Sequence, residues 1–228
     1  MEYRNELKIV CDLSKLKLIE KAVGLVCFPD PHAGSDGRYI IRSMYFDSPD
    51  NMYYFHTKNG LDHRNKYRIR IYNGSDGYIS LECKESLHGK KHKDIQQISK
   101  NIYENILDGD NDYSGKGLLE RFSVDCNRFL LKPVTIIEYN RVPYVYPIGN
   151  VRITIDTAII ASSMNDLFSD QLCGVNVLPG SYGVLEVKYD DVLPGAITHV
   201  LNGYDLQVSS FSKYVKARDA LWGNVGGV

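Results

Sequence analysis

The sequence predicts an α+β fold in which a large antiparallel sheet is surrounded by short amphipathic helices. Two observations indicate this fold. Several segments alternate between apolar and polar residues, which is typical of strands with one buried face, and segments with helical periodicity lie between them at irregular intervals. This order differs from the regular strand and helix alternation of parallel sheets, so antiparallel pairing is favoured.

The strand pattern recurs along most of the chain. It covers residues 3–10, 39–46, 65–72, 78–84, 91–98, 134–144, 151–157 and 183–189. The segment NGSDG at residues 73–77 joins two of these strands, and so short a turn-forming connection predicts an antiparallel hairpin.

Helical periodicity appears in shorter segments between the strands. It covers residues 14–26, 99–107, 117–130, 195–202 and 212–222, and Ser14 and Ser99 are the expected N-caps. The sequence contains no internal repeat or proline-rich linker. We therefore expect a single domain over residues 1–222, followed by a flexible tail at 223–228.

Composition excludes several classes of protein. The 228 residues are 43% hydrophobic and 24% charged with a formal net charge of -1, which is typical of a soluble globular protein and unlike a broad nucleic-acid-binding surface. No stretch is apolar enough to span a membrane, and the N-terminus lacks the pattern of a secretion signal. We expect a cytoplasmic protein without membrane insertion or a nucleic-acid partner, whose five cysteines are reduced.

The polar face of the predicted strands is unusually rich in charge. Charged residues occupy alternate positions on strand after strand: Arg4, Glu6 and Lys8; Lys66, Arg68 and Arg70; Glu82 and Lys84; Lys91 and Lys93; Arg152 and Asp156; Glu186 and Lys188. One interpretation is a solvated sheet face with cross-strand ion pairs. The other is a closed antiparallel β-barrel with a charged interior, whose apolar outer face packs against the helices.

A charged interior has to be filled by a ligand, because buried charges without partners cost several kcal/mol each. A triphosphate meets this need. It brings several negative charges, which arginine binds through paired N–H groups and lysine through a point charge, while carboxylates among them can hold a divalent metal ion.

An ordered set of motifs resembles the VTC-type polyphosphate polymerase domain. The motifs are RNELK at 4–8, SMYFDS at 43–48, RNKYRIRIY at 64–72, LECK at 81–84, EYNR at 138–141, RITID at 152–156, LEVK at 185–188 and FSKY at 211–214. The resemblance spans residues 3–221 and points to a bacterial member. That family belongs to the triphosphate tunnel metalloenzymes, relatives of the CYTH phosphatases, and the resemblance implies a tunnel lined by basic and acidic residues.

The resemblance implies a polyphosphate polymerase, which transfers the terminal phosphoryl group of ATP to a growing polyphosphate chain and releases ADP. The phosphate ligands that it implies, expected to be catalytic, are Lys8, Arg68, Arg70, Lys84, Lys93, Arg141, Arg152 and Lys213. The further substrate-binding residues that we expect are Tyr139, Ser212, Lys66, Lys91 and Lys188. Positioning and charge neutralisation by such a set suit phosphoryl transfer, which needs little covalent help from the protein.

A metal ion, Mn or Mg, is expected as the cofactor, because carboxylate oxygens favour hard ions. Glu186 is the first candidate ligand, since it matches the late E-x-K motif of the family. Glu6, Glu82 and Asp156 are further candidates, and each could instead orient a neighbouring cation. Arg4 stands where the hydrolytic relatives have the first glutamate of an E-x-E-x-K strand, which favours transfer to phosphate over activation of water.

Two other functions stay open at this point. The same tunnel could hydrolyse inorganic or nucleoside triphosphates, or it could bind polyphosphate without catalysis. The expected partners are ATP and inorganic polyphosphate. A separate membrane protein is a further possible partner, because known eukaryotic members of the family are attached to membrane components.

Overall fold

The computed structural model describes residues 4–87, 90–110, 112–115, 117–164 and 166–223. Within these ranges the strands form a 10-stranded antiparallel sheet in the order β1-β10-β8-β7-β3-β4-β5-β6, with the short β2 and β9 paired to β7 and β8. The strands are β1 (Asn5–Asp12), β2 (Phe28–Pro29), β3 (Tyr39–Asp47), β4 (Arg64–Tyr72), β5 (Ser75–Leu87), β6 (Lys90–Ile98), β7 (Lys132–Tyr146), β8 (Val151–Ser162), β9 (Val175–Asn176) and β10 (Tyr182–Tyr189).

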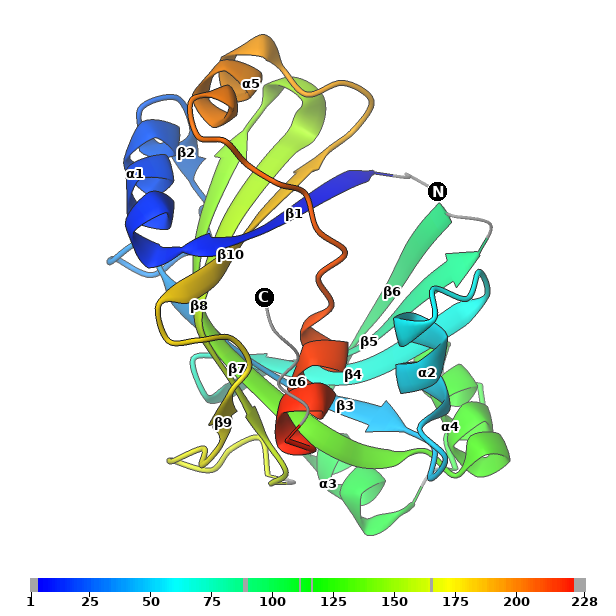
Figure 1. The fold of residues 1–228 in the computed structure, drawn as a ribbon. Coiled ribbons are helices and arrows are strands. Elements are labelled where there is room, and N and C mark those ends of the chain that lie inside the picture. The colour runs from blue at the N-terminus through cyan, green and yellow to red at the C-terminus, as the bar shows by residue number, and fades with distance from the viewer. Residues whose placement is uncertain (1–3, 88–89, 111, 116, 165, 224–228) are drawn as a thin grey trace.

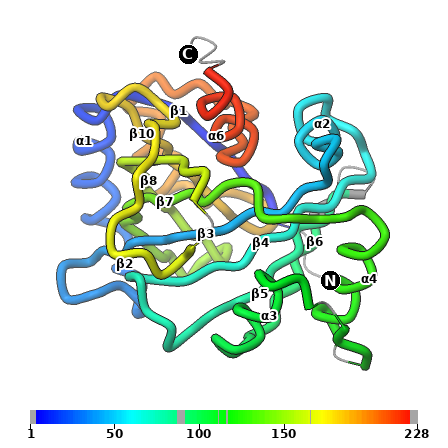
Figure 2. The backbone as a smooth tube through the Cα atoms, turned by 90° about the horizontal axis from the view of Figure 1, so that it is seen from below, coloured from blue at the N-terminus to red at the C-terminus, as the bar shows by residue number. Residues whose placement is uncertain are grey.

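The sheet is strongly curved, and most helices lie on its outer side (Figure 1). The helices are α1 (Leu13–Gly24), α2 (Met52–Lys58), α3 (Lys100–Asp108), α4 (Leu118–Phe129), α5 (Gly195–Asn202) and α6 (Lys213–Leu221), with a 3-10 turn, η1, at Ile148–Asn150. Figure 2 shows α6 between α2 and the half of the molecule that contains α1 and β1. None of the described helices has the length and apolar character that a membrane crossing requires.

Two apolar clusters fill the space between the sheet and its outer helices. One joins Leu16, Ile19 and Val23 of α1 to residues on the outer face of the sheet, such as Ile153 on β8 and Leu185 on β10. Each of these side chains is at most 2% exposed, and such burial contributes roughly 1.5–3 kcal/mol per residue. This cluster fixes β1, β10 and β8 as one curved wall.

The second cluster covers the other half of the sheet. Leu119 and Phe122 of α4 pack in it with Ile69 on β4 and Leu81 on β5, all fully buried. Because alternate residues of a strand point to opposite faces, this packing directs the charged positions of β4 and β5 to the concave face. The predicted apolar face packed against helices is therefore confirmed.

The prediction of a closed barrel is not confirmed. No backbone pairing joins the edge strands β1 and β6 in the described residues, and the two strands diverge in Figure 1. A ladder would need neighbouring strands about 4.8 Å apart. Instead, a side-chain ion pair crosses the opening, with Lys84 Nζ 3.4 Å from Glu6 Oε2. The segment before α6 lies beside β1, where the Ser209 N–H donates to the Lys8 carbonyl at 2.7 Å.

Local details modify several of the predicted elements. The cap at Ser99 is confirmed, since its hydroxyl accepts the Ile102 N–H at 3.2 Å, but α1 is capped by Asp12 rather than Ser14. The predicted hairpin turn is tighter than expected. Asn73 and Gly74 both have positive φ (52° and 67°), which suits a two-residue turn that matches strand twist.

Helix α2 was not expected from the sequence. It is short, and Asp47 at the end of β3 accepts the backbone N–H groups of Tyr53 and Tyr54 at 2.8 and 2.9 Å. Asp47 lies outside α2, and its side chain accepts hydrogen bonds from backbone N–H groups in the first turn of the helix. Local periodicity in the sequence does not reveal this contact.

Candidate functional site

The charged positions of the strands meet on the concave face of the sheet. Strand pairing places on this face Glu6 and Lys8 (β1), Lys66, Arg68 and Arg70 (β4), Glu82 and Lys84 (β5), Lys93 (β6), Tyr139 and Arg141 (β7), Arg152 and Asp156 (β8), and Glu186 and Lys188 (β10). Ser212 and Lys213 join them from the start of α6. Lys91 lies outside the part of the chain whose side chains the structure describes.

Glu82 forms the centre of an arginine cluster on β4 and β5. Its Oε2 accepts the Arg68 Nε–H at 2.8 Å, and its Oε1 lies 3.7 Å from Arg70 Nη1. Glu82 is 2% exposed; burial acts to raise its pKa, but the two guanidinium groups outweigh burial and lower the pKa. Arg70 also donates to Ser43 Oγ at 3.0 Å and to the Tyr139 hydroxyl at 3.4 Å, so its planar group is held in place.

Asp156 forms the centre of a second cluster. It is fully buried and accepts two N–H groups of Arg141, each at 2.7 Å, while Lys213 Nζ lies 2.6 Å from Oδ2. Burial acts to raise the pKa of Asp156, but Arg141 and Lys213 lower it further than burial raises it. The ring of Tyr139 lies beneath both cations, 5.3 Å from Arg141 and 4.8 Å from Lys213.

Glu6 and Glu186 share the same lysines. Lys8 Nζ is 3.8 Å from Glu6 Oε2 and 3.9 Å from Glu186 Oε2, and Lys188 Nζ is 3.6 Å from Glu6 Oε1 and 2.9 Å from Glu186 Oε1. Burial acts to raise the pKa of Glu6, but Lys84 and Lys8 outweigh burial and lower it to about 2. Both carboxylates are therefore ionised and face the same space.

The carboxylates differ in their capacity to hold a metal ion. Glu82 and Asp156 accept hydrogen bonds from guanidinium groups, whereas Glu6 lies 3.4–3.8 Å from the ammonium groups of three lysines, Lys8, Lys84 and Lys188. Carboxylate oxygens suit a hard ion such as Mg or Mn, so Glu6 and Glu186 are the residues that could hold one. Among the described residues, no group of three or more histidine, cysteine, aspartate or glutamate side chains is placed to hold a metal ion.

Lys66 and Lys93 occupy positions of high positive charge. Lys66 Nζ lies 3.5 Å from Ser212 Oγ and 5.9 Å from the centre of the Tyr214 ring. Burial and then Lys84, Lys8 and Arg68 lower the pKa of Lys66 well below its usual value. Lys93 lies on the edge strand β6. Desolvation lowers its pKa to about 8; the charge of Glu82 opposes this shift, and the charges of Arg68 and Arg70 add to it.

Arg152 and Arg4 lie at the periphery. Arg152 Nη2 is 2.9 Å from Asp30 Oδ2 and donates to the Tyr39 hydroxyl at 3.0 Å, so it faces a separate buried carboxylate. Arg4 Nε lies 3.1 Å from Asp190 Oδ1 at the start of β1. The position that would carry a first glutamate in an E-x-E-x-K strand therefore forms a surface ion pair instead.

Sequence reasoning did not assign a role to several hydroxyl groups on the concave face. Ser43 orients Arg70, and Tyr45 accepts the Arg68 Nη1–H at 3.0 Å. Ser80 Oγ and Thr154 Oγ1 are buried and have no hydrogen-bond partner among the described residues. The period of two could have identified Ser80 and Thr154, because each is two positions from a predicted site residue on its own strand. Ser43 and Tyr45 lie on β3 opposite Arg70 and Arg68, so only the strand pairing reveals them.

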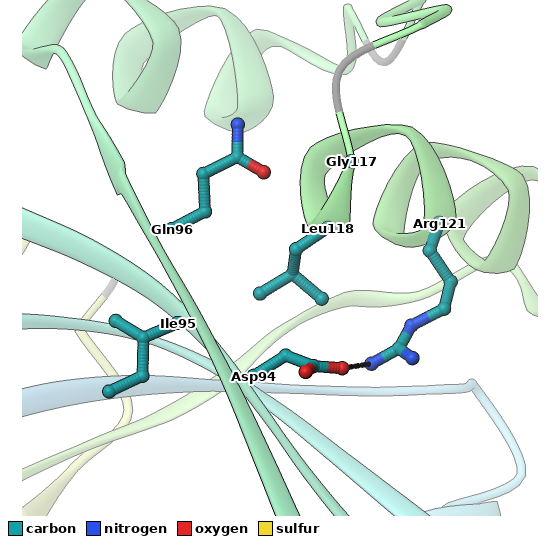
Figure 3. Close-up of a pocket in the computed structure, with 6 residues that line it drawn as sticks. All are labelled: Asp94, Ile95, Gln96, Gly117, Leu118 and Arg121. Atoms are coloured by element: carbon teal, nitrogen blue, oxygen red, sulfur yellow. Dashed lines mark ion pairs between the residues drawn. The ribbon is translucent and has the colours of Figure 1, made fainter.

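A separate hollow lies between β6 and the start of α4 (Figure 3). Its volume is about 390 Å³, and its lining includes Asp94, Gln96, Leu118 and Arg121. Its ion pair joins Arg121 Nη2 to Asp94 Oδ2 at 2.8 Å, and the Gln96 side chain accepts the Leu119 N–H at 3.0 Å. Asp94 and Gln96 lie on the face of β6 opposite to Lys93, so this hollow is on the outer side of the sheet and we take the concave face as the candidate site.

Comparison with known proteins places this arrangement in a family. The family model described as VTC domain matches residues 3–222. Comparison with the curated proteins gives no match.

Solved structures share the fold at low sequence identity. A proposed adenylyl cyclase from Hippeastrum, described as having a dominant triphosphatase activity, has a TM-score of 0.55 at 14% identity over 96% of each chain. A proposed adenylate cyclase from Bacillus halodurans has a TM-score of 0.52 at 14% identity over 89% of this chain and 87% of that one. The PH1819 protein of Pyrococcus horikoshii OT3 has a TM-score of 0.51 at 14% identity over 96% and 99%. These structures show the CYTH-like triphosphate tunnel fold, and the family match covers nearly the whole chain. The chain therefore belongs to the VTC domain family.

Proposed function

We propose that this protein is a metal-dependent polyphosphate polymerase, which transfers the terminal phosphoryl group of ATP to the end of an inorganic polyphosphate chain. The cations on the concave face outnumber the carboxylates, and Glu82 and Asp156 are already engaged by arginines. The remaining positive charge suits a polyanion with several phosphate groups.

The residues have distinct parts in this proposal. Arg68, Arg70 and Arg141 hold phosphate oxygens through planar N–H pairs whose positions are fixed by Glu82 and Asp156. Lys8, Lys84, Lys93 and Lys213 add charge around them, whereas Arg152, which the sequence predicts as a phosphate ligand, is paired with Asp30 at the periphery. The terminal oxygen of the polyphosphate chain attacks the γ-phosphorus, the bond to the bridging oxygen breaks, and that oxygen leaves with its electron pair on ADP.

Glu6 and Glu186 would hold the metal ion, since both carboxylates contact Lys8 and Lys188 and therefore lie beside each other on the concave face. A bound Mg or Mn ion supplies charge neutralisation on phosphate oxygens. The lysines around the pair keep both carboxylates ionised, and they can turn toward phosphate when a metal ion takes their place.

Arg4 is the observation that favours transfer over hydrolysis. β1 supplies one carboxylate to the concave face, Glu6, because Arg4 pairs with Asp190 at the rim. A site with fewer metal-binding carboxylates is less suited to activate water. Hydrolysis is the second candidate function, favoured by the triphosphatase activity described for the Hippeastrum protein.

Product analysis tests the proposal. The purified protein is incubated with ATP and Mn, and the products are separated by length on a gel that resolves polyphosphate. Chains longer than three phosphates support a polymerase. Free phosphate without longer chains would establish a hydrolase, and binding of polyphosphate without turnover would establish a binding module; either result overturns the proposal. Arg70→Ala should abolish synthesis, while Arg128→Ala, which changes an exposed arginine on α4, is the matched control.

A further inference from the structure

A buried carboxylate, Asp47, lies at the end of β3 within the SMYFDS motif at 43–48. Its side chain is 1% exposed, and it accepts the backbone N–H groups of Tyr53 on Oδ1 and Tyr54 on Oδ2. Oδ2 also accepts the hydroxyl of Tyr214 on α6, a residue 167 positions later in the chain. Asp47 therefore joins β3 and α2 to the start of α6.

Tyr214 is the second residue of α6, and the two residues before it reach the concave face. Lys213 Nζ lies 2.6 Å from Asp156 Oδ2, and Ser212 is the N-cap of the helix. The ring of Tyr214 is 1% exposed and stacks on the ring of Tyr45, with 5.1 Å between the ring centres. The place of Lys213 on the concave face thus depends on how Tyr214 is held.

The contact between Tyr214 and Asp47 is a strong one. Burial and the charge of Asp47 raise the pKa of Tyr214, so the hydroxyl group keeps its proton and donates it to the carboxylate. Hydrogen bonds to an ionised group are stronger than those between neutral groups, and water competes little with a buried one. This bond fixes the ring of Tyr214 in direction as well as in position.

Two further contacts fasten α6 to α2 at a different level. Arg218 Nη2 donates to Asn51 Oδ1 at 2.7 Å, and the Tyr54 hydroxyl donates to Asp219 Oδ1 at 2.6 Å. Arg218 and Asp219 lie about one helical turn after Tyr214. They hold the body of α6, whereas Tyr214 holds its first turn.

We propose that Asp47 is a positioning residue for the phosphate site, which acts through Tyr214 to fix the first turn of α6 and thereby the place of Lys213. The inference rests on the proposed function, because Lys213 is one of the phosphate ligands there. The stem of a lysine is flexible, so its backbone has to be held if the ammonium group is to meet phosphate in one position. Asp47 itself contacts no phosphate in this proposal.

Removal of a single hydroxyl group tests the inference. Tyr214→Phe keeps the ring against Tyr45 and removes the contact with Asp47, whereas Asp47→Ala would also remove the acceptors at the start of α2. Tyr53→Phe is the matched control. This tyrosine of α2 is 3% exposed, and its hydroxyl has no hydrogen-bond partner among the described residues.

Two measurements are made well below the melting temperature of each variant, namely binding of inorganic tripolyphosphate by calorimetry and kcat/KM for ATP by release of ADP. Tyr214→Phe should bind tripolyphosphate about tenfold more weakly and lose about tenfold to a hundredfold in kcat/KM. Tyr53→Phe should keep both values.

A double-mutant cycle separates positioning from a general loss of stability. Lys213→Met removes the charge and keeps a side chain of similar length. If Tyr214 acts through Lys213, Tyr214→Phe should weaken tripolyphosphate binding by less than about twofold when Lys213→Met is already present. Additive losses in the double variant would overturn the inference. So would a Tyr214→Phe variant that melts at a lower temperature but keeps its affinity for tripolyphosphate and its kcat/KM.

Failure of the proposed function gives a different result. The affinity measurements and their cycle require no turnover. An unaltered protein that makes no polyphosphate, together with a loss of affinity in Tyr214→Phe that disappears in the Lys213→Met background, would overturn the polymerase and support the positioning role of Asp47.

Discussion

Asp156→Asn removes the charge at the most deeply buried carboxylate of the concave face and keeps its shape. In the protein Asp156 is fully buried, accepts two hydrogen bonds from Arg141 at 2.7 Å and lies 2.6 Å from Lys213 Nζ. The asparagine amide presents one acceptor and one donor group, so one cation contact becomes a donor facing a donor. Arg141 and Lys213 are then left in a largely buried site without a counter-charge.

The expected cost follows from the burial of this group of residues. The side chains of Arg141 and Lys213 are 10% and 12% exposed, so solvent compensates little. Removing one partner of a buried ion pair typically costs about 3–5 kcal/mol. For a chain of this size each kcal/mol lowers the melting temperature by about 2–4 °C, so we expect a decrease of about 6–20 °C.

Thermal unfolding with and without tripolyphosphate measures both parts of the argument. The ligand should raise the melting temperature of Asp156→Asn by more than that of the unaltered protein, because phosphate supplies the missing negative charge. Asp205→Asn, at an exposed position before α6, is the matched control and should change the melting temperature little. A loss below about 1 kcal/mol in Asp156→Asn, with equal stabilisation by ligand, would refute the assignment of Asp156 as the counter-charge of this cluster.

Three further predictions concern the metal, Arg70 and acid pH. Glu186→Gln should lower Mn-dependent synthesis by about tenfold or more while triphosphate still binds; unchanged dependence of synthesis on Mn concentration would contradict its role as a ligand. Arg70→Lys should lower kcat/KM for ATP by about tenfold to a hundredfold, because a lysine cannot reach both Glu82 and Tyr139 as the planar group does. Folding lowers the pKa of Glu6 from 4.5 to about 2, so its ion pairs stabilise the fold fully above pH 4.5 and lose this effect as the pH falls toward 2. Denaturant titrations that show no loss of stability between pH 4.5 and 2 would be inconsistent with these ion pairs.

Local sequence patterns are enough to predict the strands and which of their faces carries charge. Alternation in a segment such as RNKYRIRIY is local, and a strand turns successive side chains to opposite faces whatever its neighbours are. Arg68 and Arg70 were therefore assigned to one face correctly, and both contact Glu82. The start of α3 was predictable for the same reason, since the cap at Ser99 acts within one turn.

Which cation pairs with which carboxylate depends on how distant segments of the chain pack together. Lys213 reaches Asp156 because α6 lies against β8, and Lys84 reaches Glu6 because curvature of the sheet brings β5 near β1. Strand order and curvature depend on the packing of helices such as α1 and α4 on the outer face, and no local pattern encodes them. The opening between β1 and β6 has the same origin. Alternation predicts strands that could close a barrel, but the packing of the two halves of the sheet sets the distance between its edge strands. Charged side chains, rather than a backbone ladder, therefore occupy the opening.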